Sequence, residues 1–420
     1  MKRLFRNRNF SILFIGRLIT NIGDSMYYIA AMWLVYKLGG SAFYSGLAGF
    51  LTMLPQSLQF ITGPIVDRCS IRKLLIVTQV LQAILLSLIP IAYYWHMLSV
   101  TLVLIVMPLA ACLNQVSFPA ESALIPQILS KALRVRANSL MAVAQQGTDA
   151  AFNAISGALV ALVGAIALYS ADILTFFIAA LLFSALKLHH APLDQKTLSL
   201  KEQANHYFID LREGFQLVFH SFLAKILVAS AITNFVFGAM MASLPAYSDT
   251  IGGAKTYGLL LAGMSIGSLI GAGSAGLFER FAFGHLMIAG YTLGFLCWLT
   301  SLFVPVLSLK IILFSSSMIP IGLTNVLSFA MMQNIIPQHL MARSISVVAS
   351  ISSCIMPIGS LIGGALSALL GARLVFASAS ISLLFLALYI FIVPILRRIP
   401  AIHQVQPEKY GFHSLAADEK

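Results

Sequence analysis

Four polar side chains share one face of an apolar stretch near the amino terminus. Arg17, Asn21, Asp24 and Tyr28 are spaced by four, three and four residues, which places them on one side of a helix. A carboxyl group in apolar surroundings generally has a raised pKa, so it can bind and release a proton near neutral pH. The pattern predicts a proton- or cation-sensing site at Asp24. The alternative is an Arg17–Asp24 pair that only lowers the cost of burial, with the two residues about 10 Å apart along the axis.

A second polar face occurs further along the chain. Gln145, Asp149 and Asn153 follow one another at intervals of four residues in a stretch otherwise rich in Ala, Val, Leu and Ile. Such a face should point to water or to another part of the protein. Two interpretations stay open for Asp149: a direct role in binding protons or substrate, and a packing network completed by Arg17.

The composition says what surrounds these side chains. The chain has 420 residues, of which 59% are hydrophobic and 10% charged, and its mean hydropathy is +0.91. Soluble globular chains have about 25% charged residues, and the strands of an outer-membrane barrel give a much weaker hydropathy signal. The sequence therefore predicts an all-α integral membrane protein and excludes a soluble enzyme, a disordered chain and a disulfide-stapled secreted domain.

Twelve apolar runs are separated by short polar turns, and their boundaries are uncertain by several residues. The predicted spans are 10–36, 43–66, 74–95, 99–121, 138–164 and 167–187, followed by 221–248, 256–278, 285–304, 310–334, 344–370 and 373–396. Asp172 is expected at the outer end of the sixth span, as an interfacial acid. Gln79 and Gln82 in the third span are expected to join helices, as amides often do in membranes.

The net charge of +12 is unevenly distributed along these spans. With the amino terminus inside, outward-facing turns hold only Lys37, Lys255, Lys310 and Arg373. This bias fixes orientation, so both termini are predicted to be cytoplasmic and no nucleic-acid partner is expected. The cysteines show no metal-ligand or disulfide spacing, and no cofactor or metal is predicted.

The two sets of six spans resemble copies of each other. Ile125-Pro126-Gln127 recurs as Ile336-Pro337-Gln338, and Ser156-Gly157-Ala158-Leu159 recurs as Gly363-Gly364-Ala365-Leu366. A parallel repeat of six spans is typical of transporters whose binding site lies near the midplane between the halves. We therefore predict a six-helix bundle at 1–190, a cytoplasmic linker with an amphipathic helix at 191–220, a second bundle at 221–398 and a cytoplasmic tail at 399–420.

The turn after the second span carries a family resemblance. It reads Gly63-Pro64-Ile65-Val66-Asp67-Arg68-Cys69-Ser70-Ile71-Arg72-Lys73. This resembles the cytoplasmic loop signature of the major facilitator superfamily, Gly-x-Leu-x-Asp-Arg-x-Gly-Arg-Lys, with Ser70 in place of the second glycine. The resemblance implies a cytoplasmic gate formed by Gly63, Asp67, Arg68, Arg72 and Lys73. It also implies that Arg72 reaches an acid at the base of the fourth span, for which Glu121 is well placed.

Within that superfamily the chain looks like the drug-exporter branch that includes macrolide-efflux proteins. The resemblance rests on Gly23-Asp24, on Phe118-Pro119-Ala120 through Ile125-Pro126, and on Met356-Pro357-Ile358-Gly359. It implies a monomeric exporter of hydrophobic or amphiphilic small molecules in the plasma membrane, driven by proton antiport with alternating access. It also implies a cavity wall that includes Asn21, Tyr28, Asn114, Gln145 and Asn153 from the first half. From the second half the same wall would include Asn234, Phe237, Met241 and Asn325.

Other functions remain as alternatives. The alternatives are an exporter of a siderophore, a peptide or a lipid-like metabolite, and an importer of the same fold. An enzyme is not expected, because the sequence contains no His-Glu-x-x-His and no histidine falls at the middle of a predicted span. It also has no glycine-rich phosphate-binding loop, so ATP is not expected to drive transport.

Overall fold

The computed structural model describes residues 2–57, 70–187, 223–335, 338–401 and 404. These residues form helices and turns, and no strand occurs among them. The predicted linker at 191–220 lies outside the described residues, as do Gly63, Asp67 and Arg68 of the predicted gate.

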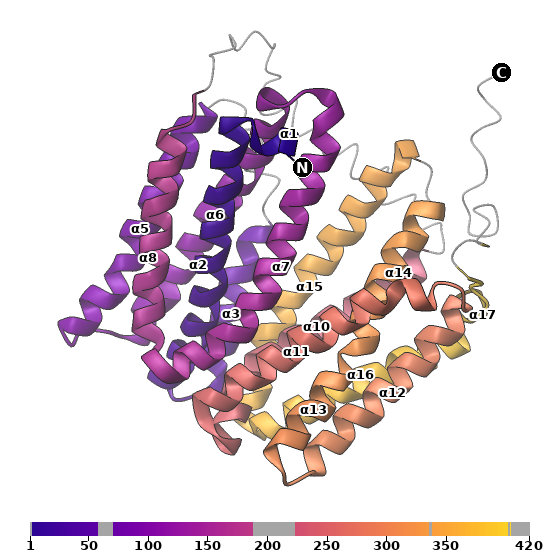
Figure 1. The fold of residues 1–420 in the computed structure, drawn as a ribbon. Helices are drawn as coiled ribbons and strands as arrows, with labels where there is room; N and C mark the ends of the chain where they lie inside the picture. Colours follow the sequence, from indigo (N-terminus) through magenta and orange to yellow (C-terminus); the bar gives the residue numbers. More distant parts are fainter. Residues whose placement is uncertain (1, 58–69, 188–222, 336–337, 402–403, 405–420) are drawn as a thin grey trace, which may run out of the picture. The chain divides into compact units, whose positions relative to one another are not determined.

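The helices of the first half match the first six predicted spans (Figure 1). A short helix, α1 (Lys2–Phe5), precedes them. The spans are α2 (Arg8–Gly39), α3 (Ala42–Ser57), α5 (Ile71–Tyr94), α6 (Val100–Ile128), α7 (Lys131–Val163) and α8 (Ala165–Ser184).

The second half repeats the pattern with one difference. Its helices are α10 (Leu223–Ile251), α11 (Gly253–Phe278), α12 (Phe283–Phe303), α13 (Leu307–Ser317), α14 (Ile319–Ile335), α15 (Gln338–Leu370), α16 (Ala372–Ile392) and the short α17 (Pro394–Arg397). The tenth predicted span is therefore two helices, α13 and α14, which are interrupted at Met318 just before Pro320.

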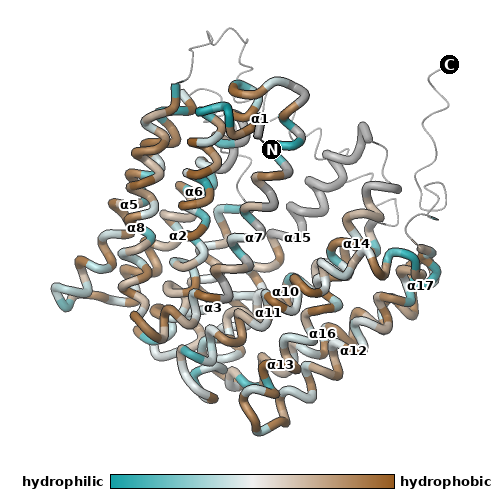
Figure 2. Tube along the Cα trace, viewed as in Figure 1, coloured by the Kyte–Doolittle hydropathy of each residue, from teal (hydrophilic) through white to brown (hydrophobic). Residues whose placement is uncertain are grey.

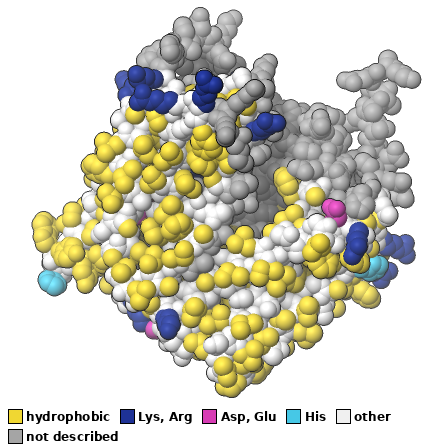
Figure 3. All heavy atoms as spheres, viewed as in Figure 1, with side chains coloured by type: hydrophobic (Ala, Val, Ile, Leu, Met, Phe, Trp, Pro, Cys, Tyr) yellow, Lys and Arg dark blue, Asp and Glu magenta, His cyan; other side chains and the backbone are white. Residues whose placement is uncertain are grey.

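Eight helical segments of the described residues are long and apolar enough to cross a membrane. They comprise α5, the first part of α6, α8, α10, α11, α12, the α13–α14 pair and α16. The other four predicted spans correspond to α2, α3, α7 and α15. Of these, α2 and α7 carry the polar faces described above. Figure 2 shows the apolar residues running along the helices. Figure 3 shows Lys and Arg side chains gathered near α1 at one end of the visible face. The all-helical membrane fold is confirmed.

The chain divides into two compact units. One contains Met1–Gln203 together with Ser248–Gly258, and the other contains Ala204–Tyr247 and Leu259–Lys420. The short segment Ser248–Gly258, where α10 ends and α11 begins, therefore belongs with the first unit. Within that unit Lys37 Nζ binds Asp249 Oδ1 at 2.7 Å, and the rings of Trp33 and Tyr257 stack with centroids 5.5 Å apart.

Helix ends in the first unit follow from local sequence. The side chain of Asn7 accepts a hydrogen bond from Phe10 N and so caps the start of α2, and Gly40 ends that helix with φ of 66°. A positive φ of this size favours glycine because it lacks a Cβ. Gly164 makes the turn from α7 to α8 at φ 83°, and Gly371 makes the turn from α15 to α16 at φ 93°. The repeat seen in the sequence is thus present in backbone conformation.

Helix packing holds α2 at the centre of the site described below. It packs against α8, α7, α3 and α6, while α5 packs against α6 and α8. Near the amino-terminal end of α2 an apolar cluster brings together Phe10, Leu13, Leu75, Leu124 and Phe183. Polar side chains further along α2 are therefore held by helices on several sides.

The second unit has its own core. Buried Phe283, Leu327 and Met331 belong to one cluster, and stacked Tyr247 and Phe376 lie 4.2 Å apart between ring centroids. The first residues of the predicted tail are part of this packing. Phe283 N donates to Pro400 O and Gly284 N donates to Ile399 O, each at 3.2 Å.

Candidate functional site

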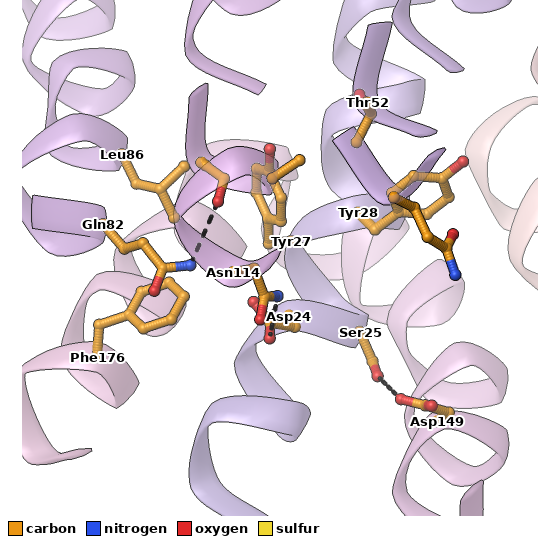
Figure 4. Close-up of a pocket in the computed structure, with 13 residues that line it drawn as sticks. Asp24, Ser25, Tyr27, Tyr28, Thr52, Gln82, Leu86, Asn114, Asp149 and Phe176 are labelled. Atoms are coloured by element: carbon orange, nitrogen blue, oxygen red, sulfur yellow. Dashed lines mark hydrogen bonds between the residues drawn. The ribbon is translucent and has the colours of Figure 1, made fainter. Parts of the chain in front are cut away.

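A pocket of about 430 Å³ lies among the helices of the first unit. Its walls come from α2, α3, α5, α6, α7 and α8, and Figure 4 shows its lining side chains. The lining residues are Asp24, Ser25, Tyr27, Tyr28, Thr52, Gln56, Gln82, Leu86, Ala110, Ala111, Asn114, Asp149 and Phe176. Two of them are acids, and none is Lys, Arg or His. Carboxyl groups, amides and hydroxyls thus share the pocket with aromatic rings.

Asp24 lies on the pocket wall beside an amide from α6. Asn114 Nδ2 donates to Asp24 Oδ2 at 3.1 Å, and Figure 4 shows the two side chains meeting. The amide is a neutral donor, so it does not compensate the charge of an ionised carboxylate. An arriving proton or cation can therefore still change the charge balance at this residue.

Asp149 reaches the same pocket from α7. Ser25 Oγ donates to Asp149 Oδ1 at 2.9 Å, so the residue next to Asp24 on α2 binds the second acid (Figure 4). The two predicted acids therefore line one pocket. Ser25, which follows Asp24 directly on α2, links α2 to Asp149. Arg17 also interacts electrostatically with Asp149, so both interpretations of Asp149 stay open.

Arg17 forms an ion pair with Glu121 and interacts electrostatically with Asp24. Its Nε lies 3.3 Å from Glu121 Oε2 on α6, and the two side chains are only 9% and 3% exposed. Arg17 is seven residues from Asp24, about 10 Å along the helix, whereas Glu121 faces it where α2 and α6 pack. Arg17 is thus held beside Glu121, and it is not among the residues that line the pocket.

The predicted pairing of Arg72 with Glu121 is also corrected. Arg72, in the first turn of α5, donates from Nη2 to the carbonyl oxygen of Ser184 at the end of α8. The last carbonyl groups of a helix lack partners within the helix and carry partial negative charge, which attracts a nearby cation. Lys73 is exposed. The role of these residues in a gate remains a prediction.

Some of the other predicted cavity residues line the pocket and some lie outside its lining. Tyr28 and Asn114 line it, whereas Asn21 and Gln145 do not. Asn21 is buried, and its Nδ2 has no hydrogen-bond partner among the described residues. The side chain of Asn153 lies outside the described residues.

The predicted wall residues of the second half belong to the other unit. Asn234 Nδ2 donates to Ser230 O within its own helix, at 2.9 Å. Phe237 and Met241 are partly buried on α10, and Asn325 on α14 is exposed. Their contribution to a substrate cavity remains a prediction.

Several residues in or behind the pocket wall were not expected from the sequence. Gln82, predicted to join helices, lines the pocket and also donates to Ala110 O at 3.5 Å. Asp172, predicted to be interfacial, is 0% exposed and lies beside Gly23 of α2. A signal for Asp172 was available, because it lies eight residues after Gly164, about 12 Å into a helix. Tyr27 and Phe176 carried no such signal, since aromatic residues occur throughout apolar spans.

Comparison with known proteins gives one family over almost the whole chain. The family of transmembrane secretion effectors, within the major facilitator superfamily, matches residues 3–417. The MFS-type transporter YvqJ of Bacillus subtilis (strain 168) is 22% identical over 364 residues, which cover 85% of each chain. The multidrug efflux pump Tap of Mycolicibacterium fortuitum is 23% identical over 407 residues, covering 92% of this chain and 96% of Tap.

Solved structures share the fold at low identity. A bacterial homologue of the human lysosomal transporter Spinster, in an inward-facing and unoccupied conformation, has a TM-score of 0.68 and 14% identity, covering 96% of this chain and 99% of its own. A bacterial homologue of the iron transporter ferroportin has a TM-score of 0.67 and 14% identity, covering 91% of this chain and 98% of its own. At this identity the likeness concerns the fold alone.

Proposed function

The chain belongs to the transmembrane secretion effector family of major facilitator transporters, and from that premise we propose that it exports hydrophobic or amphiphilic small molecules in exchange for protons. The observation that carries the proposal is the pair of acids in one pocket. Asp24 and Asp149 both line it and are hydrogen-bonded to neutral side chains, Asn114 and Ser25.

The chemistry of the pocket favours a cationic or protonatable substrate. The lining residues carry carboxyl groups and no basic side chain, so a positive charge on the substrate would be stabilised there. Tyr27, Tyr28 and Phe176 offer aromatic surface for apolar groups and for cations. The volume of about 430 Å³ falls within the range of about 300–1,000 Å³ that is common for small-molecule sites.

Proton exchange follows from competition for the same carboxyl groups. A proton that binds Asp24 or Asp149 removes the negative charge that holds a cationic substrate, and a bound substrate disfavours protonation. If the proton-bound form favours the inward- or the outward-facing conformation and the substrate-bound form favours the other, substrate leaves the cell as a proton enters. We place the protein in the cell membrane with both termini in the cytoplasm, in accord with the distribution of Lys and Arg.

Inverted membrane vesicles test this function. We expect uptake of cationic dyes or macrolides into the vesicles when a pH gradient is present, and its loss when a protonophore collapses the gradient. Equal uptake with and without the protonophore would contradict proton antiport. Movement in the opposite direction would favour an importer.

Variants of the two acids test the site. Asp24→Asn and Asp149→Asn should each weaken binding of a cationic substrate about tenfold or more, which corresponds to about 1.4 kcal/mol. Asp249→Asn is the matched control, because Asp249 lies in a partly exposed pair with Lys37 and away from the pocket lining. Normal binding, transport and pH dependence in both pocket variants would contradict the proposed site.

A further inference from the structure

A fully buried acid, Asp172, lies on α8 behind the wall of the pocket. Its side chain is 0% exposed. Oδ1 accepts a hydrogen bond from Thr175 Oγ1 at 3.0 Å, and Oδ2 has no partner among the described residues. Thr175 Oγ1 also lies 2.8 Å from the carbonyl oxygen of Asp172, so its single proton is shared between two acceptors. The carboxyl group thus has very little hydrogen bonding.

Such surroundings favour the neutral carboxylic acid over the carboxylate. A buried carboxylate is tolerated when a cation or several donors compensate it, and within a membrane span an uncompensated charge is costly. Neither ion pair found among the described residues includes Asp172. A proton on Oδ2 removes the charge and accounts for the oxygen without a donor.

The backbone of α2 lies directly against this carboxyl group. A Cβ atom at Gly23 would overlap Asp172 Oδ1 and Thr175 Oγ1. Only glycine therefore lets α2 and α8 approach this closely here. The next residue of α2 is Asp24, so the buried acid and the pocket acid belong to one contact between two helices.

Two tyrosines lie near Asp172 and interact with it electrostatically. Tyr27 of α2 and Tyr169 of α8 meet edge to face with ring centroids 5.3 Å apart. Both hydroxyl groups are buried without a hydrogen-bond partner among the described residues, and Tyr27 lines the pocket. A hydroxyl can accept one proton while it donates another, so the pair can relay a proton once water enters.

The ionisable groups around Asp172 are few. Asp24, Tyr27 and Tyr169 interact with it electrostatically. The ionisable residues of α5 lie at its two ends (Arg72, Lys73, Tyr93 and Tyr94). On α7 the nearby acid is Asp149, which accepts a hydrogen bond from Ser25. The charge of Asp172 is therefore controlled mainly by what happens at Asp24 and in the pocket.

We propose that Asp172 is a second proton-binding site of the transporter, which holds a proton while the pocket is empty and releases it when a cation enters the pocket. The O–H bond of the carboxylic acid breaks, the proton passes by way of Tyr27 to water in the pocket, and the carboxylate that remains is stabilised by the positive charge of the cation. The proposal rests on the proposed export function, because it assigns a second proton that the substrate displaces, beside the one exchanged at Asp24 or Asp149.

Infrared difference spectroscopy of the purified full-length protein tests the proton directly. The probe is tetraphenylphosphonium, a permanent cation that carries no proton itself. We expect the C=O band of a protonated carboxylic acid in the wild type, with a shift in D2O and a loss of intensity when the probe binds. The part of the band that comes from Asp172 should be absent in Asp172→Asn, shifted in Asp172→Glu and unchanged in Asp249→Asn. A missing band, or one that responds neither to the probe nor to a pH series, would overturn the proposal.

Transport assays separate this proposal from the export function. In proteoliposomes, Asp172→Asn should retain exchange of labelled for unlabelled tetraphenylphosphonium, which moves no net proton, but show a smaller accumulation driven by a pH gradient than the wild type. Accumulation equal to that of the wild type would overturn the role of Asp172. Absence of gradient-driven accumulation in the wild type would instead refute the export proposal, and the pH series of the infrared band would then decide whether Asp172 exchanges its proton.

Discussion

At the scale of single residues, the acids of the first unit have different surroundings. Glu121 is paired with Arg17, whereas Asp24 and Asp149 face a pocket with neutral partners. A carboxylate that a neighbouring cation already compensates has little tendency to bind a proton when a substrate arrives or leaves. The residues best suited to change charge are therefore those of the pocket.

The pair of Arg17 and Glu121 should contribute to stability as a unit. Removing one partner of a buried ion pair leaves an uncompensated charge. Arg17→Gln and Glu121→Gln should each lower the thermal stability of the purified protein, and the double variant should lose less than the sum of the two. We expect a coupling free energy of about 0.5–3 kcal/mol.

A second ion pair provides the comparison for this cycle. Lys37 and Asp249 are 47% and 31% exposed, so the same neutral substitutions should show a coupling of about 0.2–1 kcal/mol. Additive losses at Arg17 and Glu121 would mean that their contact contributes nothing to stability.

The choice of partners could not be predicted from the sequence. The helical spacing correctly put Arg17, Asn21, Asp24 and Tyr28 near one another on α2. Which of them meets another helix depends on how α2 is rotated against α6 and α8, and that is decided by packing. For this reason Arg17 binds Glu121, and Asn21 lies off the pocket lining although its neighbours face it.

At the scale of elements, the apolar runs predicted the helices well, and the interrupted span was the exception. Pro320 was visible in the sequence, but a proline in a membrane span often only bends a helix. Close backbone contacts explain the local arrangement better. Gly267 of α11 lies against the carbonyl of Ser315 and Gly271 against that of Ile319, on either side of the break at Met318.

Close packing of α10 and α15 gives a prediction about glycine. A Cβ atom at Gly359 would overlap the backbone of Phe235. Gly359→Leu should therefore lower the stability of the protein by about 1–3 kcal/mol or more, as overpacking does, and reduce its melting temperature in detergent.

The same substitution at an open position serves as the control. Gly273 of α11 is exposed, and nothing lies within 4 Å of a Cβ built there. Gly273→Leu should leave the melting temperature nearly unchanged. Equal melting temperatures for the two leucine variants would show that the α10–α15 contact is not tight.

The end of the described chain contributes to the start of α12. Ile399 is 0% exposed, and the carbonyls of Ile399 and Pro400 accept the amide protons of Gly284 and Phe283. Truncation after Arg398 should cost about 1.5–3 kcal/mol from the lost burial of the Ile399 side chain alone. Truncation after Gln404 retains these contacts and should not reduce thermal stability, so equal losses in the two truncated proteins would contradict the role of Ile399 and Pro400.

At the scale of the whole molecule, the sequence predicted the fold more completely than the function. Hydropathy and charge bias are set by the bilayer, and the internal repeat is set by the six-helix bundle. Both constraints are common to all membrane proteins built from two such bundles. Cargo depends on the shape of a pocket assembled from six helices, and residues such as Gln82 and Phe176 line it without a motif. Transporters with different printed names share this fold, so transport assays are needed to identify the substrate.

The placement of Ser248–Gly258 with the first unit has a consequence for biosynthesis. Translation delivers α2 to α8 to the translocon well before this segment leaves the ribosome. Until then Trp33 and Lys37 lack the partners that they have in the finished protein, Tyr257 and Asp249. The amino-terminal bundle therefore lacks these two contacts while it is in the bilayer, until the next part of the polypeptide has been synthesised.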